Sequence, residues 1–325
     1  MISTDKGILI ISLDFEMTWG GVGVWDKTSY TESNVANVRK AIIQMLELFK
    51  KYEVKATFAT VGLLMLKDKI EVLKHTPELN PSYCNKALSP FEGHYLENIG
   101  DESLYFAPDI ISLLKKYDNI EIGTHTFSHY FCWEMGQTIE EFESDIKKAV
   151  EVAKDNGLEL KSIVFPRNQV SAEYLQVCKK YGIISYRGNA KRFYDQTSNK
   201  FEFYYNKIAR FMDSYVNYGG RPSYKLHESE IKALPINIRA SRFLRPYNRR
   251  LSVLEKLKIK HVCSELEYAA KHGEVYHLWW HPHNFGMDLS NNLKELETIL
   301  QHYSILRDKY GMQTCTMADC SMLYY

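Results

Sequence analysis

Two histidines four residues apart, His125 and His129, are the first residues whose type and spacing suggest chemistry. On one helical turn their imidazoles would face the same side, as a divalent metal needs from two ligands on one local segment. The spacing alone is weak support, because 11 histidines in a chain of this length give about 0.4 such pairs by chance. Their position is more informative. Residues 119–123 have the pattern of a short strand closed by glycine, which would put His125 at the carboxyl end of a sheet, where α/β proteins bind ligands.

Two other predicted strands also end in polar residues that could complete this site. The first leads into Asp14 and Glu16, and a later one leads into His281 and His283. Two histidines and one carboxylate leave open positions on a zinc-type ion, as a hydrolytic metal site requires. A second carboxylate could then act as general base and a further histidine as general acid. His277 lies inside its predicted strand, and we interpret it as a hydrogen-bonded core residue.

The composition restricts the kinds of partner. The chain has 325 residues, of which 45% are hydrophobic and 25% charged, and its net charge is +1. Nucleic-acid and membrane-surface binders usually carry a large basic excess, so neither partner is expected. The six cysteines form no Cys-x-x-Cys pair, the apolar run 8–13 is too short for an export signal, and no run is long enough for membrane insertion. We therefore expect a cytoplasmic protein.

Strand and helix patterns alternate along the chain, which predicts a mostly parallel α/β fold. We predict strands at 7–13, 55–62, 119–123, 161–165, 183–186, 235–240, 275–280 and 313–317. We predict helices at 34–52, 108–117, 138–157, 172–181, 252–272 and 289–310, with Pro108 as an N1 proline and a capping box at Thr138. Two poorly periodic regions, 63–107 and 188–231, are predicted to be insertions at the rim of one barrel-like domain that spans 1–325.

Several motifs resemble those of a known enzyme family. Residues 55–62 (KATFATVG) look like its second-strand signature, and residues 121–129 (EIGTHTFSH) closely match its metal motif. Residues 165–168 (FPRN) resemble its arginine motif, His281-Pro282 resembles its final histidine motif, and residues 311–319 are similar to its last strand. The chain thus resembles the polysaccharide deacetylases of the NodB-homology type, carbohydrate esterase family 4.

This resemblance implies a distorted (β/α)7 TIM-like barrel that binds one divalent metal, most commonly Zn2+. It assigns Asp14 as the catalytic base and Glu16, His125 and His129 as the metal ligands. The sequence departs from the family pattern in the first motif, where Asp-x-Glu stands in place of adjacent aspartates. The division of ligand and base between the two carboxylates is therefore open.

The resemblance also assigns Arg167 to orient the base and keep it ionised, and His281 to protonate the departing amine, with His283 as a competing residue. The implied activity is hydrolysis of the N-acyl amide, usually N-acetyl, of a carbohydrate or glycan precursor. Alternatives on the same fold are a deformylase, an ester hydrolase and an allantoinase-like cyclic amidase. An alternative of another class is a carbohydrate-binding barrel without catalysis.

Two further surfaces could recognise a substrate. The stretch from Arg239 to Lys260 contains eight basic residues and one acidic residue, Glu255. It is either a solvated helix face or a surface for the phosphate of a nucleotide-linked or lipid-linked sugar. Aromatic residues cluster at 193–205 and could stack on sugar rings or hold the second insertion against the barrel.

Overall fold

The structure, a computed structural model, describes residues 5–23, 29–92, 95–190, 208–226 and 235–323. The aromatic cluster predicted at 193–205 lies outside these residues. Within the described ranges, no helix combines the length and the apolar character that a membrane span needs.

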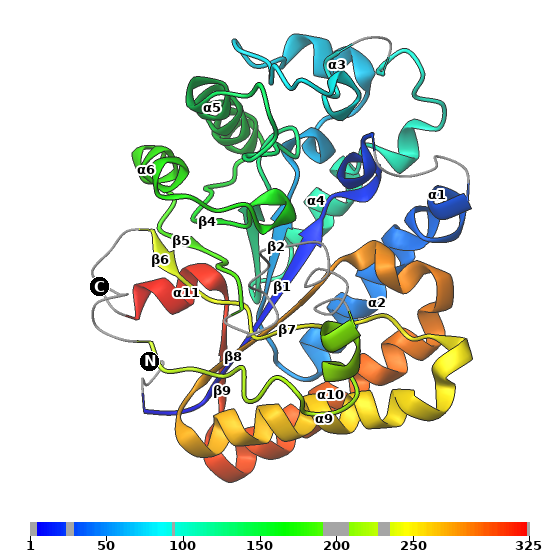
Figure 1. Cartoon of the computed structure of the whole chain (residues 1–325), viewed down its shortest axis with the longest axis vertical. Helices are drawn as coiled ribbons and strands as arrows, with labels where there is room; N and C mark the ends of the chain where they lie inside the picture. Colours follow the sequence, from blue (N-terminus) through cyan, green and yellow to red (C-terminus); the bar gives the residue numbers. More distant parts are fainter. Residues whose placement is uncertain (1–4, 24–28, 93–94, 191–207, 227–234, 324–325) are drawn as a thin grey trace.

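A parallel sheet forms the centre of the molecule (Figure 1). Among the described residues it has nine strands in the order β6-β5-β4-β3-β2-β1-β8-β7, with β9 paired to β1 outside this path. The strands are β1 (Ile8–Phe15), β2 (Ala56–Thr60), β3 (Ile120–Thr124), β4 (Ser162–Ile163), β5 (Ser185–Tyr186), β6 (Ile236–Asn237), β7 (Arg242–Phe243), β8 (Val275–Trp280) and β9 (Gln313–Cys315). Because these strands pair in parallel, their carboxyl ends meet along one edge.

The strand β1 lies in the middle of the sheet and is buried along its whole length. It pairs with β8 over Ile8–Leu13, with β9 over Ile8–Ile10 and with β2 over Ser12–Phe15. A strand buried on both faces is expected to be a nearly continuous apolar run, as 8–13 is. Since side chains alternate between the two faces of a strand, Ser12 and Asp14 lie on the same face.

The sheet curls until its two end strands approach each other. Only residues 238–241 lie between β6 and β7 in the chain. Within this crossing, the Ala240 amide donates to the Gly188 carbonyl at 2.9 Å and the Ser241 amide donates to the His277 carbonyl at 2.8 Å. The segment 238–241 therefore contacts both a residue just after β5 and a residue of β8, and it links the two ends of the sheet into a distorted half-barrel. The predicted α/β barrel is confirmed.

Helices surround the outer side of this sheet (Figure 1). The longer ones are α2 (Val38–Lys51), α4 (Pro108–Leu114), α5 (Ile139–Asp155), α6 (Ala172–Lys180), α9 (Ser252–His272) and α10 (Leu289–Tyr310). Two shorter helices are α1 (Ser29–Ser33) and α3 (Lys69–Lys74), whereas α11 (Met317–Met322) packs against Ile8 and Ile10 on the face of β1 that also carries Ser12 and Asp14. Pro108 is the first residue of α4, and Thr138 caps α5 with a reciprocal bond to Glu141, as predicted. In the described part of the region 63–107, the helical segments are short, α3 among them. The single-domain organisation over 1–325 stays a prediction.

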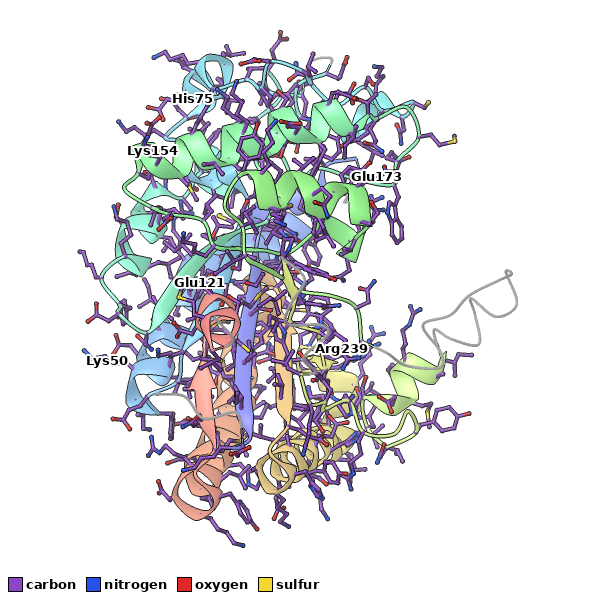
Figure 2. The ribbon with its side chains drawn as sticks, turned by 90° about the vertical axis from the view of Figure 1, so that its left-hand side faces the viewer. Lys50, His75, Glu121, Lys154, Glu173 and Arg239 are labelled. Atoms are coloured by element: carbon purple, nitrogen blue, oxygen red, sulfur yellow. The ribbon has the colours of Figure 1, made fainter. Side chains whose placement is uncertain are left out.

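The Glu121 side chain (Figure 2) anchors α11 to the sheet. One carboxylate oxygen accepts from the Thr57 hydroxyl at 2.7 Å and from the Ala318 amide at 3.0 Å, and the other accepts from the Ser162 hydroxyl at 2.6 Å. Glu121 is the second residue of β3, so α11 is held near the amino ends of the strands. The candidate site lies at the opposite edge of the sheet, at the carboxyl ends of the strands.

The basic stretch 239–260 does not form one phosphate-facing surface. Arg242 is buried in ion pairs with Glu265 at 2.6 Å and Asp213 at 3.0 Å. Lys258 is also buried, between Glu255 and Glu295. Burying a charge is costly unless it is paired, which is why these two cations point inward at carboxylates. The interpretation of the stretch as a phosphate-binding surface is therefore wrong for these two residues.

Candidate metal centre

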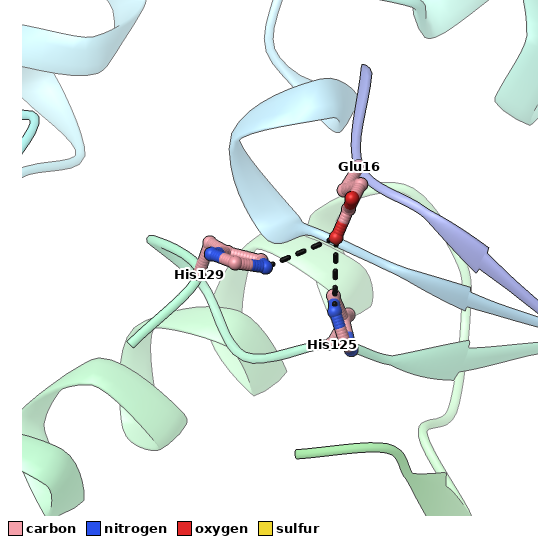
Figure 3. A group of neighbouring side chains, drawn as sticks. All are labelled: Glu16, His125 and His129. Atoms are coloured by element: carbon pink, nitrogen blue, oxygen red, sulfur yellow. Dashed lines mark ion pairs between the residues drawn. The ribbon is translucent and has the colours of Figure 1, made fainter. Parts of the chain in front are cut away.

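Three buried side chains meet at the carboxyl ends of β1 and β3: Glu16, His125 and His129 (Figure 3). The Nε2 atom of His129 lies 3.0 Å from Oε2 of Glu16, and Nε2 of His125 lies 3.3 Å from the same oxygen. One potential ligand atom from each residue lies within 4.8 Å of the other two. Glu16, and not Asp14, is thus the carboxylate that joins the two histidines.

The hydrogen bond on the far side of His125 indicates that this group fits a metal. Its Nδ1 atom lies 2.8 Å from the Val164 carbonyl oxygen, which can only accept, so Nδ1 carries the proton. In the neutral imidazole, Nε2 then presents a lone pair to the Glu16 carboxylate. Two acceptors that face each other need a cation, and two imidazoles with one carboxylate are the donor set of a hydrolytic zinc-type site.

The segment that carries the two histidines is a loop and not the helical turn that their spacing suggests. Thr126 and His129 have φ angles of 64° and 61°, which no α-helix contains. Asp145 on α5 holds this loop, because its carboxylate accepts from the Phe127 amide at 2.7 Å, the Ser128 amide at 3.1 Å and the Ser128 hydroxyl. The capped helix α5 therefore positions this loop, residues 125–129, which is the metal loop of the site.

Two glycines allow close approaches at this site. A Cβ on Gly62, which follows β2, would lie 2.6 Å from the Phe127 ring and 3.0 Å from its Cα, so the KATFATVG glycine lets the metal loop pack against β2. A Cβ on Gly20 would lie 2.2 Å from the carboxyl carbon of Glu16. Gly20 therefore provides the space into which the Glu16 side chain folds.

Asp14 is bound by an arginine other than the predicted one. Both terminal nitrogens of Arg187 contact its carboxylate, at 2.6 and 2.7 Å, and both side chains are buried. Arg167 instead lies 3.9 Å over the Phe131 ring and 3.6 Å from Glu134, with 39% of its side chain exposed. The contact predicted for Arg167 is therefore made by Arg187.

The backbone after β4 explains this difference. Arg167 and Asn168 both have φ angles of 54°, so the chain turns sharply there. The turn directs the Asn168 side chain to Arg187, at 3.1 Å. Arg187 directly follows β5. The rule that drew attention to Asp14, a polar residue directly after a predicted strand, therefore also applies to Arg187.

The surrounding charges keep both carboxylates of the site ionised. Burial raises the pKa of Asp14, but Arg187, with His125 and His281, outweighs it and holds the pKa below its ordinary value. Burial also raises the pKa of Glu16, but the imidazoles around it hold the pKa well below the ordinary value. An ionised carboxylate is what a metal ligand and a general base both require.

His281 is better placed than His283 to donate a proton. Its Nε2 lies 3.6 Å from Glu16 and 3.7 Å from Asp14, and 23% of its side chain is exposed. The side-chain amide nitrogen of Asn284 lies 3.3 Å from Nδ1 and holds the ring in place. His283 is buried and stacked against His281, and burial lowers its pKa to about 3.

The structure thus brings six of the seven predicted site residues together and leaves Arg167 at the rim. His277 is the hydrogen-bonded core residue that its place in the strand indicates. The sequence analysis missed the residues that hold the predicted ones in place: Ser12, Asp145, Asn168, Arg187 and Asn284.

The fold and the site define a parallel α/β barrel in which one carboxylate and two histidines, a group able to hold a metal ion, lie at the carboxyl ends of the strands. Residues 38–185 match the family model described as polysaccharide deacetylase, and this match confirms the resemblance seen in the motifs. A search of curated proteins gives no match.

Solved structures show the same fold at low sequence identity. A protein from Mycobacterium smegmatis assigned as a polysaccharide deacetylase has a TM-score of 0.59 and 10% identity over 100% of this chain and 92% of that chain. The 4-alpha-glucanotransferase from Thermococcus litoralis has a TM-score of 0.51 and 12% identity over 98% of this chain and 41% of that one. At such identities the likeness establishes the fold alone, so the activity must be inferred from the site.

Proposed function

We propose that this chain is a metal-dependent deacetylase that hydrolyses the N-acyl amide, most simply N-acetyl, of a carbohydrate or glycan precursor. The observation that carries this proposal is the group Glu16, His125 and His129 beside the Asp14–Arg187 ion pair. The family match supports the carbohydrate as substrate. We further propose zinc as the ion and leave a phosphate-linked substrate and a cytoplasmic location as predictions.

Glu16, His125 and His129 would hold the ion. When bound, it would supply Lewis-acid polarisation of the acyl carbonyl and a lowered pKa for water. Asp14 would accept the proton of the attacking water, and Arg187 keeps this carboxylate ionised and oriented. Amide hydrolysis also needs a proton on the departing nitrogen, because an amide anion is a very poor leaving group. His281, as the imidazolium, would donate it from Nε2, the nitrogen that faces both carboxylates, and would be left as the neutral ring.

The test combines metal analysis with acetate release. Purified protein should contain one divalent ion per chain and release acetate from N-acetylglucosamine oligosaccharides or a nucleotide-linked N-acetyl sugar. A chelator should abolish the release, and Zn2+ should restore it. His125→Ala should lose the metal and the activity, whereas His75→Ala, at the end of α3, should keep both.

Other assay results would indicate a different function. Formate release or opening of a cyclic amide would reassign the bond that is broken, and hydrolysis of an O-acetyl sugar alone would make the protein an esterase. Sugar binding without any hydrolysis would favour a carbohydrate-binding barrel. An active protein without metal, unaffected by His125→Ala, would overturn the mechanism.

A further inference from the structure

Two buried residues below the Asp14–Arg187 pair, Ser12 and His277, form a continuous hydrogen-bonded chain with it. The Ser12 hydroxyl lies 3.1 Å from Nη1 of Arg187 and 2.8 Å from Nε2 of His277. Nδ1 of His277 lies 3.1 Å from the Ile238 carbonyl oxygen. Ser12, His277 and Arg187 all have no exposed surface.

The direction of every bond in this chain is determined by its two ends. The Ile238 carbonyl can only accept, so Nδ1 of His277 carries the proton. In the neutral ring Nε2 must then accept, and the Ser12 hydroxyl donates to it. The Ser12 oxygen is left to accept from Arg187, which can only donate. A protonated His277 would break this order, but burial and the charge of Arg187 lower its pKa to about 3.

The strand register places these groups. Ser12 and Asp14 lie on the same face of β1, and β8 pairs alongside with Ile10 opposite His277. Trp279, two residues further along β8, covers the Arg187 guanidinium at 4.0 Å. The guanidinium is therefore held by Asp14, Ser12, Asn168 and the Trp279 ring.

We infer that Ser12 and His277 form a positioning relay that fixes Arg187 in its two-bond contact with Asp14 and so orients the base. This inference rests on the proposed function, because it assumes that Asp14 is the base. Neither residue contacts the reacting atoms. Their effect passes through Arg187, whose guanidinium could otherwise rotate away from one carboxylate oxygen.

The first test is the kinetic effect of removing the relay. Ser12→Ala should lower kcat about 10-fold to 100-fold, as the loss of a supporting hydrogen bond does at comparable sites. KM and the bound metal should stay unchanged, because Ser12 contacts neither the substrate nor the metal ligands.

Two matched substitutions at His277 distinguish a role in hydrogen bonding to Ser12 from a role in packing alone. His277→Gln offers an acceptor near the place of Nε2 and should retain most of the kcat. His277→Asn keeps a donor near Nδ1 but lacks the acceptor, and it should resemble Ser12→Ala. Combining Ser12→Ala with His277→Asn should add little further loss, because both remove one unit.

A measurement without turnover keeps this inference separate from the proposed function. In the folded protein, a two-bond nitrogen–proton NMR correlation should show His277 as the Nδ1–H tautomer. The opposite tautomer would overturn the relay even if the enzyme is active. An unchanged kcat in folded Ser12→Ala, or equal losses in the Gln and Asn variants, would overturn it too. Absence of hydrolysis in the wild type would instead count against the proposed function.

Discussion

Asp14 and Glu16 lie two residues apart, yet their carboxylates face different partners. Glu16 contacts the imidazoles of His125 and His129, whereas Asp14 receives both terminal nitrogens of Arg187. Their positions around the end of β1 separate them, since Asp14 is inside the strand and Glu16 is the first residue after it. This separation suits one carboxylate for a metal and the other for proton transfer.

Conservative amides should separate the two roles. We expect Glu16→Gln to lose bound metal, because the neutral amide removes the only carboxylate of the metal-binding group. Asp14→Asn should keep the metal and lower kcat by about 100-fold to 10,000-fold, which is the usual contribution of a general base. Metal content and kcat measured on the same preparations check this. Metal loss in Asp14→Asn with retention in Glu16→Gln would reverse the assignment.

The two arginines should differ in stability as well as in activity. Arg187→Met leaves the Asp14 carboxylate buried without its cation, and breaking such a pair costs about 3–5 kcal/mol. Arg167→Met removes a partly exposed ion pair and a contact with the Phe131 ring, each worth about 1 kcal/mol at most. Urea unfolding of both variants measures the difference. Equal losses would show that the Asp14–Arg187 contact is not the stabilising one.

At the scale of elements, short connections place the metal ligands. Glu16 precedes the 3-10 helix Met17–Gly21, and the metal loop follows β3. Both connections depend on space beside them. Gly20 leaves room for the Glu16 carboxylate, and Gly62 leaves room for Phe127 of the metal loop.

Gly20→Ala should therefore weaken metal binding in a protein that still folds. The new Cβ would lie 2.2 Å from the Glu16 carboxyl group, and the end of a flexible side chain moves more readily than backbone. We expect weaker metal binding with little loss of stability, measured by competition with a chromophoric chelator and by thermal unfolding. Gly100→Ala is the matched control, because its Cβ would meet nothing within 4 Å. Full metal binding in Gly20→Ala would contradict the role given to this glycine.

The sequence predicts the elements well where periodicity and capping determine them. The strands that lead to Asp14, His125 and His281 and the capped helix α5 were predictable, because burial on one or both faces leaves a pattern. The strands β4, β5 and β6 also have two residues each but lie inside predicted strands, whereas the two residues of β7 lie outside every predicted strand.

The identity of the arginine that binds Asp14 could not be predicted from such patterns. Arg167 and Arg187 both follow predicted strands, and the curvature of the sheet decides which one reaches Asp14, 173 positions away from Arg187 in the chain. The loop 125–129 was equally hidden, because its positive φ angles fall on Thr126 and His129, residue types that give no glycine signal. Long-range closure and local strain are the parts of the site that one sequence does not reveal.

For the whole molecule, the buried ion pair of Arg242 and Glu265 links stability to pH. Burial raises the pKa of Glu265, but Arg242, together with His261, outweighs it and lowers the pKa to about 2. Because the unfolded value is near 4.5, the pair stabilises the fold fully above that pH and is lost as the pH falls towards 2.

Comparison with Glu265→Gln isolates this contribution. The variant lacks the titrating carboxylate, so the stability difference between wild type and variant should narrow by about 3 kcal/mol as the pH falls from 6 towards 2. Urea unfolding across this range measures it, with Glu267→Gln, which is exposed and paired to Lys271, as a control. If the difference in unfolding free energy between wild type and Glu265→Gln did not change with pH, the ion pair would not be lowering the pKa of Glu265.

The three neighbours of β1 have a consequence for hydrogen exchange. Since β8, β9 and β2 all pair with this strand, its amides can exchange only when the whole sheet opens. Ser12 and Asp14 lie within this strand and Glu16 follows it directly. The amides of β1 should thus be as slow to exchange in metal-stripped protein as in loaded protein. The site would then be preassembled, unlike that of a zinc finger, whose chain folds only around its ion.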